Sequence, residues 1–263
     1  MVPVKNLGDL RWYSGLYYER DIDRGTIKIL QQTYSEELAK EYGVVNGKSI
    51  PMSASVKLEE FSAEEETTSF PFRELVGSLM WLATQTRPDI SNAVRAVAGY
   101  CASPKLIHWR TALGILGYVR RTSSLGITFY RGSIAGLSLQ VFSDADYASK
   151  VTDGRSVSGG LIMCGGGCVS RFSKKQKSVT LSTTEAEYVA ITDVVKEVLF
   201  LRQVWSFMLP EMTMACIPVF ENNEGVIQIA KNPVTNSNSK NIDVRHHFMR
   251  ELVARKEISL IST

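Results

Sequence analysis

Two acidic stretches, Ser143-Asp144-Ala145-Asp146-Tyr147-Ala148 and Thr184-Glu185-Ala186-Glu187-Tyr188, decide the fold class of this chain. The first ends the alternating apolar run Leu137-Ser138-Leu139-Gln140-Val141-Phe142, which predicts a strand. The second opens a long amphipathic pattern, which predicts a helix. Carboxylates at a strand end and at a nearby helix start can converge on one point, where they repel each other unless a cation joins them. Because hard divalent metals prefer oxygen ligands, metal-assisted phosphodiester chemistry is the leading hypothesis.

The residues from 135 onward predict a mixed sheet flanked by helices. A glycine turn at Gly165-Gly166-Gly167 joins two of the strands into a hairpin. The strands are expected at 137–143, 158–163, 169–173 and 217–220, and the helices at 184–208, 224–230 and 243–255. This order, a meander followed by helix, strand and helix, is typical of α+β or α/β domains.

The first half of the chain predicts a hairpin followed by helices. Residues 7–31 form two aromatic and aliphatic runs around a turn, and a helix is expected from Thr33 to Tyr42. Residues 44–69 are rich in glutamate and predict a solvated flexible segment. Three helices are expected between 70 and 123, and a short strand at 125–130.

The composition indicates an ordinary globular chain. Of its 263 residues, 44% are hydrophobic and 22% charged, and the net charge is only +3, so a nucleic-acid surface must be a local patch. The four cysteines match neither a zinc nor a redox motif, and we expect free thiols in a reducing compartment. No apolar run approaches the roughly 18 residues of a membrane span. Met1 is not followed by a signal-peptide pattern, so an intracellular protein without membrane partners is expected.

Nuclease chemistry with two metal ions needs about four carboxylates around ions roughly 4 Å apart. Asp144 at the end of the first strand is the expected bridging ligand. Glu187 lies three residues inside its helix, on the turn nearest that strand end. The strand at 217–220 should lie beside the first strand and deliver a third acid, Glu221, at its own end.

The C-terminal part of the chain resembles the ribonuclease H domain of copia-type retrotransposon Pol polyproteins. The matching stretches are Ser143–Ala148, Arg155–Gly159, Ser173–Gln176, Ser182–Ala190, Ala230–Pro233 and Ile242–Glu251. Upstream, Leu7–Leu10 resembles the closing palm segment of the family's reverse transcriptase. Leu75–Ala83, Thr86–Ile90, His108-Trp109 and Leu116–Val119 resemble its thumb and connection region.

This resemblance implies an organisation of four parts. Residues 1–45 would be the end of the reverse transcriptase palm, 46–69 an acidic linker, 70–134 a helical thumb or connection region, and 135–263 a ribonuclease H-like domain with a mixed five-stranded sheet. The rest of the Pol polyprotein and an RNA–DNA hybrid would be the partners. Two Mg²⁺ or Mn²⁺ ions would be the cofactors. The location would be cytoplasmic virus-like particles, with the nucleus as a second location.

The resemblance also implies roles for individual residues. Asp144 and Glu187 would be the first two metal ligands. The third acid is normally an aspartate followed by asparagine, and this chain has Glu221-Asn222, whose longer side chain would displace the metal or the water. The fourth acid of the family is expected beyond Thr263. The polymerase's paired aspartates are expected upstream of Met1, so the polymerase site would be absent and the nuclease site compromised.

Each candidate has a structural alternative. Ser182-x-x-Glu185 is a capping box, and so is Thr184-x-x-Glu187. Asp146 is either a ligand-supporting carboxylate or a turn cap, and Asp243 either a helix cap or a substitute ligand. Three lysines in a predicted loop are either solvated or contact phosphates: Lys174, Lys175 and Lys177.

Three functional hypotheses remain open at this level. The chain hydrolyses the RNA strand of RNA–DNA hybrids, or it is a catalytically degenerate remnant that binds nucleic acid without cutting it, or it has neither activity. The 2′-hydroxyl and the backbone phosphates would identify the RNA strand.

Overall fold

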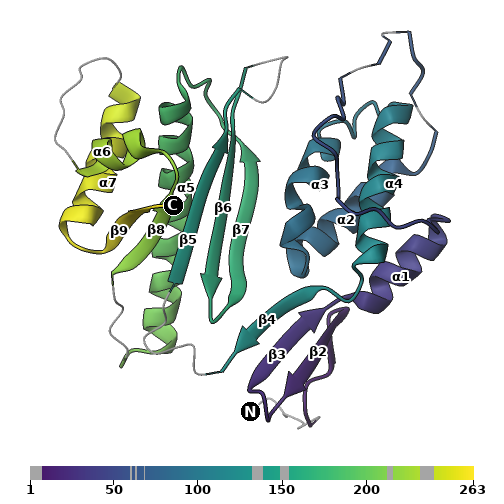
Figure 1. The fold of residues 1–263 in the computed structure, drawn as a ribbon, viewed down its shortest axis with the longest axis horizontal. Helices are drawn as coiled ribbons and strands as arrows, with labels where there is room; N and C mark the ends of the chain where they lie inside the picture. Colours follow the sequence, from purple (N-terminus) through teal and green to yellow (C-terminus); the bar gives the residue numbers. More distant parts are fainter. Residues whose placement is uncertain are drawn as a thin grey trace, which may run out of the picture. The chain divides into compact units, whose positions relative to one another are not determined.

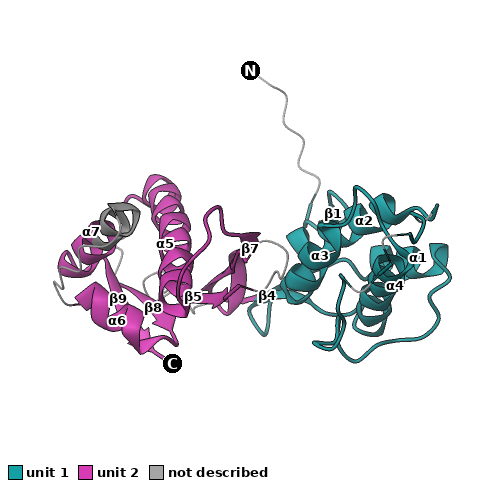
Figure 2. Cartoon of the chain, turned by 90° about the horizontal axis from the view of Figure 1, so that it is seen from above, with its two compact units in different colours: residues 1–128 teal, residues 129–263 magenta. Residues whose placement is uncertain are grey.

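The computed structural model describes residues 8–59, 61–62, 64–67, 69–131, 139–148, 154–211, 216–231 and 240–263, without the side chains of 240–246. The chain divides into two compact units, residues 1–128 and residues 129–263 (Figure 2). Each unit has its own hydrophobic core. Among the described residues, no helix is long and apolar enough to cross a bilayer.

Unit 1 begins with the predicted hairpin. Its sheet has the order β1-β2-β3-β4, formed by Trp12–Tyr13, Leu16–Asp21, Thr26–Leu30 and Gly126–Tyr130. At the β2–β3 turn, the Arg24 amide donates to Asp21 Oδ1 at 2.8 Å and Gly25 has a φ of 63°, a conformation that glycine adopts without strain. The hairpin and the short strand at 125–130 are therefore confirmed.

The helices of unit 1 form a small bundle. They are α1 (Gln32–Glu41), α2 (Phe72–Gln85), the 3₁₀ turn η1 (Pro88–Ile90), α3 (Ser91–Ala98) and α4 (Leu106–Arg121). Their apolar faces meet in one core that includes Leu75, Leu79, Val97 and Leu116, all buried. The predicted helical spacing is confirmed because each buried position recurs every three or four residues.

Most described residues of the glutamate-rich segment are exposed and lie outside helices and strands, but the segment is anchored to α4 at two points. Leu58 is buried, and its carbonyl lies 2.8 Å from His108 Nε2 in α4. The Glu65 carboxylate accepts the Leu106 amide at 3.2 Å, and the Glu65 carbonyl accepts Lys105 Nζ. These contacts join residues about 40 to 50 positions apart in sequence, which local composition does not encode.

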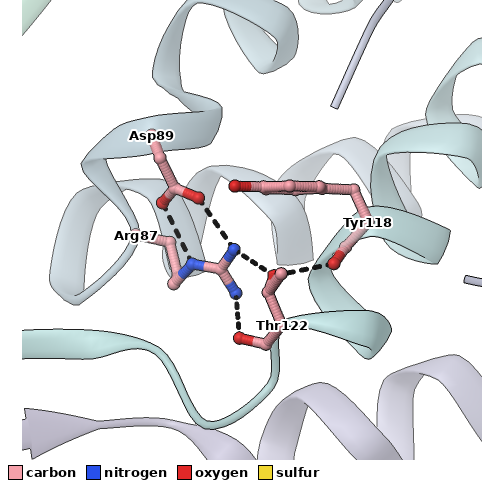
Figure 3. Close-up of polar contacts among 4 residues, drawn as sticks. All are labelled: Arg87, Asp89, Tyr118 and Thr122. Carbon is pink, nitrogen blue, oxygen red and sulfur yellow. Dashed lines mark hydrogen bonds and ion pairs between the residues drawn. The ribbon is translucent and has the colours of Figure 1, made fainter. Parts of the chain in front are cut away.

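A buried arginine fixes the end of α4 against the turn before α3 (Figure 3). Arg87 is only 2% exposed and holds Asp89 through two bonds, Nε to Oδ1 at 3.0 Å and Nη2 to Oδ2 at 2.8 Å. The same guanidinium donates to the Thr122 carbonyl at 3.1 Å and to Thr122 Oγ1 at 2.6 Å, and lies over the Tyr118 ring. Burial opposes ionisation of Asp89, but the Arg87 bonds outweigh it and lower the pKa of Asp89.

Unit 2 contains a five-stranded mixed sheet with the order β7-β6-β5-β8-β9. The strands are β5 (Leu139–Asp146), β6 (Val157–Cys164), β7 (Gly167–Lys175), β8 (Ile217–Glu221) and β9 (Ile258–Ser262). The first three are antiparallel, whereas β8 pairs in parallel with both β5 and β9. The expected start of β5 at Leu137 lies outside the described residues. The expected mixed five-stranded sheet is confirmed, although no sequence pattern placed β9.

Three helices cover this sheet (Figure 1). The long helix α5 (Thr183–Met208) packs on β5 and β6, while α6 (Glu224–Lys231) and α7 (Lys240–Ala254) lie against β9. The β6–β7 hairpin closes through Gly165 and Gly166, both at positive φ, as a two-residue turn of this type requires. All four cysteines are free thiols, as expected.

Gly160 of β6 is a point where α5 approaches the sheet closely. A Cβ atom there would lie 2.4 Å from the Phe172 ring and 3.0 Å from Val194 of α5. We therefore expect Gly160→Ala to destabilise unit 2 by about 1–3 kcal/mol, measured by urea unfolding. Gly159→Ala is the matched control, because the nearest atom to its added Cβ is the Asp144 carbonyl at 3.6 Å. Equal losses for the two variants would contradict this account of the packing.

Candidate active site

Parallel pairing of β5 with β8 brings two of the predicted acids to the same end of the sheet, where both strands have their carboxyl ends. Val141 lies opposite Val219 and Phe142 opposite Phe220, with the two phenyl rings stacked at 4.9 Å. Asp144 and Glu221 follow these pairs at the carboxyl ends of their strands. The expectation that the fourth strand lies beside the first is confirmed.

Glu187 of α5 lies near the same end of the sheet. The helix is capped by Ser182, whose Oγ accepts the Glu185 amide at 3.1 Å, and the Glu185 carboxylate accepts the Leu181 amide at 2.7 Å. Glu185 therefore caps the start of α5, as the capping interpretation predicted, but its carboxylate binds the amide of Leu181 rather than that of Ser182. Glu187 does not serve as a cap: its buried carboxylate accepts a hydrogen bond from the backbone of Ala145 in β5.

Burial and neighbouring carboxylates raise the pKa values of Glu187 and Glu221. Burial raises the pKa of Glu187 to about 8, and the nearby carboxylates of Glu221 and Asp144 add to the effect. Burial also raises the pKa of Glu221 to about 7, with a further contribution from Asp144, although the Asn223 amide, 3.0 Å from Glu221 Oε1, opposes the shift. Asp144 itself is exposed. Glu187 and Glu221 are thus buried carboxylates that lie near enough to Asp144 for its charge to raise their pKa values.

The carboxylate oxygens of this site are chemically suited to a hard divalent cation. Oε2 of Glu187 and Oε2 of Glu221 are buried and have no hydrogen-bond partner, which is costly for a carboxylate unless another group compensates it. Oxygen ligands of this kind suit Mg²⁺ or Mn²⁺. Within the parts of the chain that the structure describes, however, no group of three acidic, histidine or cysteine side chains is arranged to hold a metal ion.

The other predicted site residues lie in different surroundings. Asp146 ends β5 and is exposed, opposite Val157 of β6. Asp243 belongs to α7, and its side chain lies outside the described residues. The structure therefore adds no contact that would assign a role to either carboxylate.

The prediction that the three lysines lie in a loop is wrong for Lys174 and Lys175. Lys174 and Lys175 end β7, because pairing with β6 continues as far as Val157 opposite Lys175. Lys174 Nζ lies 3.2 Å from Asp193 Oδ2 and over the Phe172 ring. Lys177 follows the strand and is exposed. The strand end was missed because Ser173, Lys174 and Lys175 are all polar, so no apolar alternation marks it.

Sequence reasoning missed a buried polar group beside the acids. Ser156, Ser158, Gln176 and Thr180 are each at most 3% exposed and are joined by hydrogen bonds. No periodicity marks these residues, because short polar side chains next to a strand are equally typical of solvated loops.

The strand order, the parallel β5–β8 pair and the acids at its end define unit 2 as ribonuclease H-like. The transposon TNT 1-94 Pol polyprotein of Nicotiana tabacum is 31% identical over 268 residues, which cover 98% of this chain and 20% of that protein. The transposon RE1 Pol polyprotein of Arabidopsis thaliana is 32% identical over 95% of this chain and 17% of its own length. The chain belongs to the retrovirus-related Pol polyproteins of copia-type transposons, as expected.

The chain spans about a fifth of the length of the first of these polyproteins. The secreted RxLR effector protein 161 of Plasmopara viticola is also similar, with 40% identity over half of this chain and 91% of that protein. No protein-family model matches the chain.

Two solved structures are similar in fold. LC11-RNase H1 in complex with an RNA/DNA hybrid covers 48% of this chain and 85% of its own, with 11% identity and a TM-score of 0.35. The foamy viral protease-reverse transcriptase in complex with dsDNA covers 94% of this chain and 45% of its own, with 8% identity and a TM-score of 0.48. The strand order and registers, rather than these scores, identify the fold.

Proposed function

We propose that unit 2 hydrolyses the RNA strand of an RNA–DNA hybrid with the help of divalent cations. The observation that carries the proposal is the convergence of Asp144, Glu187 and Glu221, with buried carboxylate oxygens that lack partners. Asp144 and Glu187 would hold the cations, two in number, and Glu221 would complete the set. Bound Mg²⁺ or Mn²⁺ would activate water and stabilise charge on the phosphate.

The protein's own residues would position the substrate and the ligands. The Ala145 amide orients Glu187, and the Asn223 amide orients Glu221, so both carboxylates are held before a cation arrives. Lys175 and Lys177, near the end of β7, would contact backbone phosphates, and Lys174 would do so in exchange with Asp193. Contacts to the 2′-hydroxyl would select the RNA strand.

Unit 1 would act as the part of a reverse transcriptase that follows the palm. We propose that residues 1–45 end the palm, that 46–69 connect it to the helices, and that 70–134 form the thumb or connection region. The partners would be the remainder of the Pol polyprotein and the hybrid that its polymerase produces, in cytoplasmic particles.

The test is cleavage of a labelled RNA–DNA hybrid by the chain in Mg²⁺ or Mn²⁺. Asp144→Asn is expected to lower the rate by at least about 100-fold, because a lost metal ligand removes several kcal/mol of transition-state stabilisation. Glu224→Gln, an exposed carboxylate on α6, should leave the rate unchanged. Double-stranded DNA should not be cut.

A second candidate function is binding of the hybrid without cleavage. The observation that favours it is Glu221, whose longer side chain replaces the aspartate of the resembling family, together with the lack of a group arranged for metal binding among the described residues. If neither the wild type nor Glu221→Asp cuts the hybrid, even when the chain is extended past Thr263 to the expected fourth acid, hydrolysis is excluded. Hybrid binding that survives Asp144→Asn would then establish this second function.

A further inference from the structure

We infer that Gln176 positions Glu187 for cation binding. The inference rests on the proposed function only in identifying Glu187 as a ligand. Gln176 follows β7, is 3% exposed, and its backbone amide donates to the Ser156 carbonyl at 2.9 Å. The side chain is thereby fixed between the sheet and the start of α5.

The Gln176 amide group bridges β6 and α5. Its Nε2 donates to Ser158 Oγ at 3.0 Å and to the Ala186 carbonyl at 2.9 Å. The Ala186 carbonyl belongs to the peptide bond that immediately precedes Glu187. Both hydrogens of the amide are therefore used to hold the backbone that carries the ligand to a residue of the sheet.

These contacts close a ring of interactions around the carboxylate. Ser158 lies opposite Ala145 in the β5–β6 register, and Ala145 donates its amide to the Glu187 carboxylate. The ring runs from Ala145 to Ser158, through Gln176 to Ala186, and from Glu187 back to Ala145. Asp144, the neighbour of Ala145, is thus placed relative to Glu187 by one closed circuit.

A second bridge supports the loops on either side of the ring. Ser156 Oγ lies 2.8 Å from Thr180 Oγ1 and accepts the Ala148 amide at 3.1 Å. Ala148 has a φ of 47°, a conformation that a residue with a side chain adopts only when its surroundings fix it. These bonds anchor the chain after Asp146 and the chain before α5. The Gln176 bridge in addition ties the start of α5 to β6.

The test compares Gln176→Met with the wild type in the full chain. Methionine keeps the length of the side chain but removes both donors. The concentration of Mn²⁺ that gives half of the cation-induced rise in unfolding temperature is expected to increase about 10- to 100-fold, as for other residues that orient metal ligands. Amide hydrogen exchange should accelerate at residues 183–188 and at Ala145–Ala148, but not at Val194–Val198 of α5.

Gln31→Met is the matched control. Gln31 is also 3% exposed and accepts Thr86 Oγ1 at 2.9 Å, but it belongs to unit 1. It should leave the Mn²⁺ concentration and the exchange in unit 2 unchanged. Unchanged exchange at residues 183–188 and an unchanged Mn²⁺ concentration in Gln176→Met would overturn the inference. A wild-type chain that Mn²⁺ does not stabilise refutes the proposed function instead, and exchange alone then decides the role of Gln176.

Discussion

Arg87→Ala is expected to lower the free energy of unfolding of unit 1 by about 2–4 kcal/mol, because the buried Arg87 side chain and its hydrogen bonds are lost, although the partner Asp89 is exposed. Four hydrogen bonds to Asp89 and Thr122 disappear, together with the contact to the Tyr118 ring (Figure 3). The measurement is urea unfolding followed by tryptophan fluorescence, since three of the four tryptophans, Trp12, Trp81 and Trp109, lie in unit 1.

Two further variants show whether geometry or charge matters at this position. Arg87→Lys keeps the charge but loses the planar fork that holds both oxygens of Asp89, so we expect an intermediate loss. Arg20→Ala removes an exposed arginine 3.7 Å from Asp9 and should cost less than about 1 kcal/mol. A loss from Arg87→Ala no larger than that from Arg20→Ala would show that the buried network contributes nothing to stability.

The second large effect concerns the buried glutamates of unit 2. In the absence of divalent cations, Glu221→Gln and Glu187→Gln are each expected to stabilise unit 2 at about pH 8.5 by roughly 2 kcal/mol or more, with little effect near pH 4.5. The pKa values of Glu187 and Glu221 are raised in the folded state from 4.5 to about 8 and about 7. The folded chain therefore binds more protons than the unfolded chain, and its stability falls as the pH rises through this window.

The measurement is the urea unfolding midpoint of unit 2 by far-ultraviolet circular dichroism across this pH range. Glu224→Gln is the control, since it makes the same chemical change at an exposed position on α6 three residues after Glu221. Addition of Mg²⁺ should stabilise the wild type at high pH and should stabilise Glu221→Gln less. If the wild type and both glutamine variants share one pH profile, the three acids do not interact as described.

Much of the candidate site could be predicted from sequence because its parts are local. Alternating apolar residues place Asp144 at a strand end, and helical spacing with the Ser182 cap places Glu187 within the second turn of α5. Glu221 follows a short apolar strand in the same way. In unit 1, the helices that contain Leu79 and Leu116 could likewise be predicted from the spacing of their apolar residues.

The predictions that failed concern contacts between distant residues. The acidic segment is exposed for most of its described length, but its contacts through Leu58 and Glu65 with the start of α4, about 40 to 50 residues later, were not predicted. Lys174 was assigned to a loop, but strand pairing with β6 extends past it and Asp193 of α5 binds its ammonium group. The composition of a segment indicates how polar it is, but the residues that it contacts depend on the tertiary fold.

The sequence by itself determined most of the strands and helices, the positions of the three acids along them and the family of the chain, because periodicity, capping and motif spacing act over a few residues. Only the tertiary structure decided that β9 completes the sheet and that Gln176 ties α5 to β6. The raised pKa values of Glu187 and Glu221 belong to the same category. They arise from burial and from the mutual repulsion of carboxylates that lie far apart in sequence and meet only when the sheet and α5 have packed.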